Sequence, residues 1–116
     1  GLSGVSSDMR ALEASDDPAA AGAVGYFVHR VRREIGAMAA VLGGVDELAF
    51  CGGIGENAVA LRARICAGFD WLGLALDPAR NETRSEAVIS ADASRVRVRV
   101  VPTDEELVMA RACAAA

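Results

Sequence analysis

The sequence contains no lysine, and all twelve of its basic residues are arginine. A phosphate-binding loop of the Gly-Lys-Ser/Thr type needs a lysine to reach the phosphates, so this class of nucleotide site is excluded. A basic excess is also absent, because sixteen acidic residues leave a net charge of -4. Surfaces that bind nucleic acid carry clustered basic charge, and we therefore expect no nucleic-acid partner.

Long hydrophobic runs and closely spaced cysteines are missing as well. No apolar run approaches the roughly 18 residues that mark a membrane-spanning helix, so we expect no membrane contact. The first residues lack the charged and apolar regions of a signal peptide. Cys51, Cys66 and Cys113 are an odd number of cysteines without paired ligand spacing. This usage favours reduced thiols in a cytoplasmic protein over disulfides or zinc.

The residues that are present supply the core of one domain. Hydrophobic types make up 53% of the 116 residues, which is ample for a chain of this length. Pro18 favours the first turn of a helix and Gly43-Gly44 favours its end, so the sequence predicts one long helix between them. Apolar residues at three- and four-residue steps predict its buried stripe, and charged residues are expected to face water or a groove. The stripe is Val24, Phe27, Val28, Val31, Ile35, Met38, Ala39 and Leu42, and the charged residues are Arg30, Arg32, Arg33 and Glu34.

Downstream of this helix, the pattern alternates between strand and helix. It predicts a strand over about 47–51, a helix over about 58–68, a hairpin of 72–76 and 87–90, a strand over 95–101 and a last helix over about 104–114. Thr103 and Glu106 have the spacing of a capping box for the last helix. Such alternation is typical of an α/β fold with a mostly parallel sheet. Because parallel strands need cover on both faces, we expect a larger domain whose first strands precede residue 1.

A glycine-rich turn at residues 52–57 carries the strongest chemical signal. It follows an apolar strand and opens a helix, where free backbone N–H groups and the helix dipole favour an anion. Gly53 and Gly55 allow the backbone to approach a ligand closely, and Asn57 is able to cap the helix or bind the ligand. Two interpretations stay open: a nucleotide-binding loop, or a structural turn within a non-catalytic interaction module.

The same turn has a second functional interpretation. The spacing of Gly53, Gly55 and Ala58 fits a variant of the dinucleotide-binding fingerprint. Asp77 stands 24 positions after Gly53, where a ribose-binding acid is expected. Only a short turn and a strand follow Asp77, without a second crossover helix, which weakens this interpretation. A Rossmann-type dinucleotide-binding fragment of an oxidoreductase is therefore the alternative function.

Two further segments are candidates for ligand contact. Asp8 and Arg10 lie in a glycine- and serine-rich turn, where an arginine is able to stack on a base. The local sequence favours a simpler explanation, an exposed helix start with a charge pair. Glu105 and Glu106 follow a predicted strand, at the end where open α/β sheets collect ligands. One carboxylate is able to hold magnesium through water, although for Glu106 we favour the capping role.

Four segments together make a family resemblance: 1–10, 35–44, 52–57 and 102–106. In this order and spacing they resemble the C-terminal part of the acetate kinase family, a pattern that propionate kinases share. The resemblance covers essentially the whole chain. It implies that residues 1–116 are the C-terminal nucleotide-binding domain portion of such a kinase. The implied fold is the ribonuclease H-like α/β fold of sugar kinases, heat-shock ATPases and actin, incomplete and without its first antiparallel strands.

The resemblance also implies an activity, the transfer of the γ-phosphoryl group of ATP to acetate or propionate with Mg²⁺, giving acyl phosphate and ADP. A homodimer is implied for the intact protein. Asp8, Met9 and Arg10 match the adenosine-side segment; Gly53, Ile54, Gly55, Glu56 and Asn57 match the second nucleotide loop; Glu105 matches the acid that places magnesium.

This sequence departs from the family pattern in two ways. Met9 stands where an aromatic residue is common, which puts stacking on the base in doubt. The acyl pocket, the transition-state arginines and histidines, and the first phosphate loop have no counterpart in these residues. Because phosphoryl transfer needs positioned charge from several segments, we expect the adenosine half of a site without its catalytic half. The choice between acetate and propionate is left open.

Overall fold

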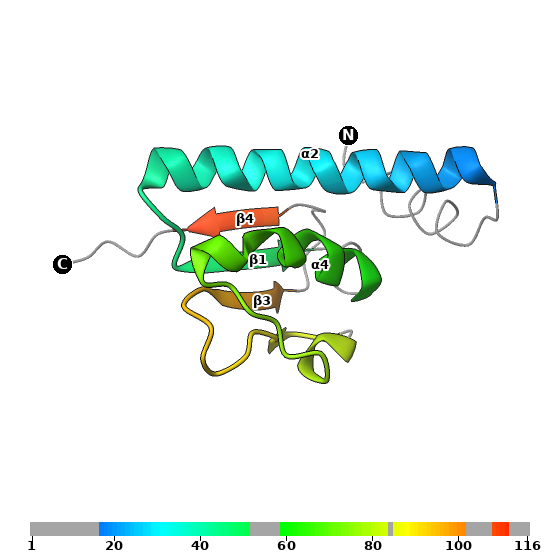
Figure 1. The fold of residues 1–116 in the computed structure, drawn as a ribbon. Coiled ribbons are helices and arrows are strands. Elements are labelled where there is room, and N and C mark those ends of the chain that lie inside the picture. Colours follow the sequence, from blue (N-terminus) through cyan, green and yellow to red (C-terminus); the bar gives the residue numbers. More distant parts are fainter. Residues whose placement is uncertain (1–16, 52–58, 84, 102–107, 112–116) are drawn as a thin grey trace.

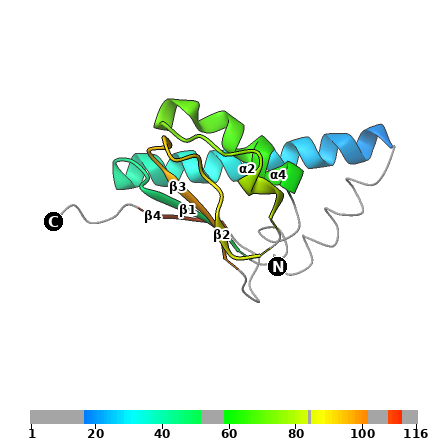
Figure 2. The same cartoon turned by 90° about the horizontal axis from the view of Figure 1, so that it is seen from below.

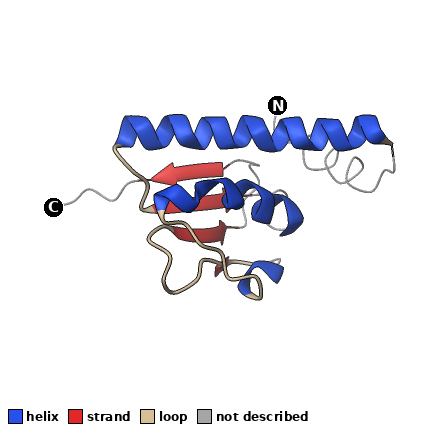
Figure 3. Cartoon of the chain, viewed as in Figure 1, coloured by secondary structure: helices blue, strands red, loops and turns tan. Residues whose placement is uncertain are grey.

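The computed structural model describes residues 17–51, 59–83, 85–101 and 108–111. Two α-helices, two short 3-10 helices and four strands make up this part of the chain (Figures 1 and 3). In chain order they are α2 (Pro18–Leu42), β1 (Glu47–Cys51), α4 (Val59–Cys66), η2 (Ala67–Leu72), η3 (Arg80–Glu82), β2 (Ala87–Val88), β3 (Arg97–Val101) and β4 (Val108–Arg111).

The long helix α2 begins and ends at the residues that the sequence predicts. Asp17 caps its start, since the carboxylate accepts a hydrogen bond from the Ala19 backbone N–H at 2.9 Å, and Pro18 occupies the first turn. At the other end Gly43 adopts a left-handed conformation with φ 77°, and its N–H donates to the Ala39 carbonyl. A side chain disfavours this backbone conformation, so glycine sets the end of the helix.

The four strands form one mixed sheet in the order β2-β3-β1-β4. β1 and β3 are parallel, whereas β4 pairs antiparallel with β1, and β2 pairs antiparallel with β3. The fold class is α/β as predicted, but the expectation of a mostly parallel sheet is wrong for the described strands. β1 lies in the interior of the sheet and all five of its residues are buried.

One face of the sheet packs against both α-helices, which lie on the same side of it (Figure 2). Successive side chains alternate between the two faces of a strand, so Leu48 and Phe50 share the helix-covered face with their register partners Val98 and Val100. These four side chains are fully buried and meet Ile65 of α4 in the main core. The other face of β1 and β3 carries an ion pair, Glu47 to Arg99 at 2.8 Å.

The predicted last helix over about 104–114 is wrong where the structure describes the chain, because Val108–Arg111 form strand β4. Alanine, methionine and glutamate favour a helix locally. Pairing with Glu47–Phe50 supplies hydrogen-bond partners to the backbone along one edge of β1, which would otherwise be open. This stabilisation by tertiary contacts overrides the local helix preference. The predicted capping box of Thr103 and Glu106 lies outside the described residues.

Three smaller expectations also need correction. The stretch 72–76 forms only one isolated antiparallel bridge, Leu76 to Ser90, in place of a hairpin strand. Met38 and Leu42 are exposed, so the buried stripe of α2 is narrower than predicted. Arg32 does not face water alone: its guanidinium donates to the Arg64 carbonyl of α4, and its Nε is buried.

Candidate functional site

The carboxyl ends of the parallel strands β1 and β3 lie side by side, because Cys51 and Val101 are register partners. The chain leaves Cys51 into residues 52–58 and continues into α4 at Val59. It leaves Val101 into residues 102–107 and continues into β4 at Val108, which pairs with Phe50 on the other side of β1 (Figure 1). Ligands of open α/β sheets bind at the carboxyl ends of such strands. The glycine-rich and the acidic segment therefore start from one edge of the sheet.

All of the site residues that the family resemblance implies lie outside the described residues. They are Asp8, Met9, Arg10, Gly53, Ile54, Gly55, Glu56, Asn57 and Glu105. The structure does describe the residues that bracket two of the three segments: Cys51 and Val59 for the glycine-rich one, Val101 and Val108 for the acidic one. These anchors bring the two segments to the same edge, whereas the segment of Asp8–Arg10 has no such pair of anchors.

A buried arginine that the sequence analysis missed fixes the start of α4. Arg62 has no exposed surface. Its Nε donates to Asn81 Oδ1 at 2.9 Å, and its Nη2 donates to the carbonyls of Asn81 and Thr83 at 2.7 and 2.8 Å. A buried guanidinium is tolerated when oxygen atoms satisfy its donors. The signal in the sequence is its helical spacing, since Arg62 falls in one stripe with Leu61 and Ile65, which are buried.

The thiol of Cys66, one turn after Arg62, is unreactive at neutral pH. Burial raises its pKa from 9.0 to about 12, although the nearby charges of Arg62 and Arg32 lower it in part. A thiol with such a pKa is protonated at neutral pH and is a poor nucleophile or metal ligand. Cys51 at the end of β1 is also buried. Both side chains pack in the interior of the described fold.

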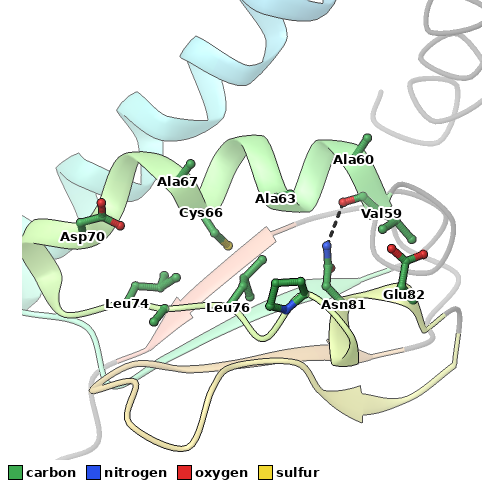
Figure 4. A pocket seen from close by; sticks show the side chains of 12 residues that line it. Val59, Ala60, Ala63, Cys66, Ala67, Asp70, Leu74, Leu76, Asn81 and Glu82 are labelled. Atoms are coloured by element: carbon green, nitrogen blue, oxygen red, sulfur yellow. Dashed lines mark hydrogen bonds between the residues drawn. The ribbon is translucent and has the colours of Figure 1, made fainter.

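A groove of about 550 Å³ runs between α4 and the segment 74–82 (Figure 4). Small and apolar side chains line most of it, including Ala63, Ala67 and Leu74, and its carboxylates are those of Asp70 and Glu82. The amide of Asn81 is occupied, since its Nδ2 donates to the Val59 carbonyl at 3.1 Å. A catalytic pocket combines an apolar lining with convergent polar groups, and the described residues that line this groove supply no such convergence.

A second groove of about 490 Å³ lies at the other end of β1 and β3, beside their amino ends. It carries charges of both signs, among them Asp46, Arg95 and Arg97. Arg80 is engaged there with Asp92 at 2.9 Å and with the Ser90 carbonyl at 2.7 Å. The balance of charge gives this groove no preference for an anion or a cation.

The described part of the chain contains neither a candidate metal cluster nor a helix that could span a membrane. No three or more histidine, cysteine, aspartate or glutamate side chains gather there to hold a metal ion. None of the helices in residues 17–42 and 59–82 is long and apolar enough to cross a membrane.

The position of Asp77 gives no support to the dinucleotide-binding alternative. Its carboxylate accepts hydrogen bonds from the backbone N–H groups of Ala79 and Arg80, at 2.9 and 3.2 Å, and so caps the turn into η3. In the fingerprint, the ribose-binding acid ends a second parallel strand. Leu76, just before Asp77, makes only an antiparallel bridge.

Comparisons with known proteins identify the relatives of this chain. Residues 1–111 match the model of the acetokinase family. An acetate kinase of Methylocella silvestris is 54% identical over 111 residues, which are 96% of this chain and 27% of that protein. The crystal structure of Porphyromonas gingivalis acetate kinase superposes with a TM-score of 0.77 at 38% identity, over 88% of this chain and 28% of that one. The crystal structure of a propionate kinase from Francisella tularensis superposes with a TM-score of 0.71 at 33% identity. The match covers 87% of this chain and 26% of that one. The chain thus spans little more than a quarter of the length of these relatives, and it belongs to the acetokinase family.

Proposed function

We propose that this chain is the ATP-binding, adenosine-side portion of a kinase that transfers the γ-phosphoryl group of ATP to acetate or propionate. The observation that carries the proposal is the register of β1 with β3. It places Cys51 and Val101, where the chain leaves the two strands, beside each other. Relatives named acetate kinase and propionate kinase, together with the family match over residues 1–111, support the same reaction class. Residues 1–116 are then the C-terminal nucleotide-binding domain portion.

The proposed roles follow the three segments of the sequence. Asp8, Met9 and Arg10 contact the adenosine side of the nucleotide. The backbone of the glycine-rich residues 53–57 approaches its phosphates, where glycine leaves room for close contact. The carboxylate of Glu105 helps to place Mg²⁺, a cation that prefers oxygen ligands and keeps several waters. Magnesium supplies charge neutralisation on the phosphates.

The acceptor half of the reaction is assigned to protein outside these residues. Phosphoryl transfer is catalysed by several positioned charges acting together, and the adenosine side supplies only part of them. We therefore expect the isolated chain to form no acyl phosphate from ATP, Mg²⁺ and acetate. A coupled hydroxamate assay checks this, and robust turnover by the chain would contradict it.

Assembly and location complete the proposal. The intact protein is proposed to be a homodimer, as the family resemblance implies. A cytoplasmic location is proposed because three cysteines without paired ligand spacing suit a reducing compartment.

The experiment that tests the proposed function is a calorimetric titration of the chain with MgATP and, separately, with NAD. The kinase assignment predicts binding of MgATP and no binding of NAD. Gly53→Val is the site variant, because a side chain there blocks close approach of the phosphates. It is expected to abolish MgATP binding while circular dichroism stays unchanged. Preferential binding of NAD would support the oxidoreductase alternative. No binding of either nucleotide would support a structural role for the glycine-rich turn.

A further inference from the structure

The bonds of Arg62 join the start of α4 to a separate part of the fold. Arg62 donates three hydrogen bonds to Asn81 and Thr83, at 2.7 to 2.9 Å, across about twenty residues of sequence. Asn81 in turn donates from Nδ2 to the carbonyl of Val59, the first residue of α4 (Figure 4). The two side chains form a closed polar bridge, and both are buried.

The far end of this bridge is itself fixed. The Asn81 backbone N–H donates to the Asp77 carbonyl at 2.9 Å within the turn of η3. Arg80, the neighbour of Asn81, is tied to the Ser90 carbonyl and to Asp92. The bridge therefore connects α4 to an anchored turn. Directional hydrogen bonds from a planar guanidinium define an orientation as well as a distance.

The apolar contacts of α4 do not define its position in the same way. Leu61 and Ile65 bury the helix against the sheet, but non-directional contacts resist sliding and rotation less than a bidentate polar bridge does. A helix of eight residues has few such apolar contacts. The charge of Arg62 is costly to bury, and an apolar residue of similar volume often packs at least as stably. An arginine at position 62 has a different advantage, because its directional hydrogen bonds hold the start of α4 in one position.

We propose that Arg62 and Asn81 are positioning residues for nucleotide binding, which set where α4 begins relative to the carboxyl ends of β1 and β3. This inference rests on the proposed function, because the nucleotide is placed at that edge. The bridge acts on affinity without touching the nucleotide. Losing it is expected to leave α4 folded against the core but to shift its first described turn, which the chain enters directly from the glycine-rich segment.

The test compares MgADP affinity with thermal stability in the whole chain. Arg62→Met is expected to raise the Kd for MgADP by roughly tenfold or more, which corresponds to about 1.4 kcal/mol. Arg62→Lys keeps the charge but not the planar guanidinium. Its Kd for MgADP is expected to lie between those of the unmodified chain and Arg62→Met. Arg64→Met is the matched control, because it makes the same change at an exposed position of the same helix and is expected to leave the Kd unchanged.

A second pair of variants separates positioning from stability. Asn81→Asp keeps an acceptor for Arg62 but loses the donor to Val59, and it is expected to weaken MgADP binding whichever way its Tm moves. Val96→Ala removes buried volume just before the amino end of β3 and is expected to lower Tm without changing the Kd. If the Kd values of all variants simply follow Tm, or if Arg62→Met and Asn81→Asp bind like the unmodified chain, the inference is overturned. An unmodified chain that binds no MgADP overturns the proposed function itself.

Discussion

Burial affects the two neighbouring polar side chains of α4 in opposite ways. The guanidinium of Arg62 is buried with three oxygen atoms as hydrogen-bond acceptors. Burial raises the pKa of the Cys66 thiol to about 12, and the charges of Arg62 and Arg32 lower it only in part. Burial disfavours the charged form of any group, and hydrogen bonds or nearby opposite charges offset that cost. The thiolate of Cys66 is therefore suppressed in the folded chain.

This pKa difference predicts a loss of stability at alkaline pH. In the unfolded chain Cys66 loses its proton near its ordinary pKa of 9.0, whereas the folded chain holds the proton to about 12. The stabilising effect is complete below pH 9.0 and declines as the pH rises toward 12. Replacing Cys66 by alanine removes this component. Thermal melts at pH 7 and pH 10 are expected to show a larger drop in Tm for the unmodified chain than for Cys66→Ala. Parallel Tm profiles would contradict the assignment.

At the scale of elements, glycines have different roles in α2 and at the end of η2. A Cβ built on Gly22 of α2 meets no atom within 4 Å. Gly73 has φ 80° and ends η2, and a Cβ there would lie 2.5 Å from Cδ of Arg95. The first glycine only increases the entropy of the unfolded chain, whereas the second is required by its backbone conformation.

Two alanine substitutions are therefore expected to act with opposite sign. Gly22→Ala should raise the free energy of unfolding by about 0.5 to 1 kcal/mol, since alanine favours the helix interior. Gly73→Ala should lower it by about 1 to 2 kcal/mol, because an L-residue is strained at this φ. Urea unfolding followed by circular dichroism measures both. The element assignment would be contradicted if the two variants shifted stability in the same direction.

Local signals made part of the fold predictable. Asp17-Pro18 and Gly43-Gly44 set both ends of α2, and an apolar run bounded by turns set β1 within its observed limits. β4 was not predictable, because residues 108–111 favour a helix locally and become a strand only through the open edge of β1. The sequence order alone does not reveal which strand edges need a partner.

The candidate site was predictable only as a set of segments. Two local patterns are visible in the sequence: a glycine-rich turn after one strand and an acidic turn after another strand. The parallel register of Cys51 with Val101 brings the starting points of the two turns together. Arg62 was missed because a charged residue is ordinarily expected at the surface. Its partner Asn81 lies nineteen residues away in sequence. Such a pairing depends on tertiary structure, which no local pattern contains.

At the scale of the whole molecule, large apolar side chains lie on the surface of the described chain. Val41 is 86% exposed, Trp71 68% and Tyr26 63%. Exposed apolar surface of this kind drives association. We expect the isolated chain to self-associate, with an apparent mass that rises with concentration in light scattering. A single monomeric mass across the concentration range would contradict this expectation.

The central claim is that the chain binds nucleotide at the edge where β1 and β3 end. The most direct test is to titrate MgADP into isotopically labelled chain and follow the backbone amide resonances by NMR. The account predicts the largest shifts at the anchors of this edge, Cys51, Val59 and Val101, with Asp46 and Arg97 at the opposite strand ends unaffected. Shifts confined to the amino ends of β1 and β3, or no saturable shifts at all, would contradict it.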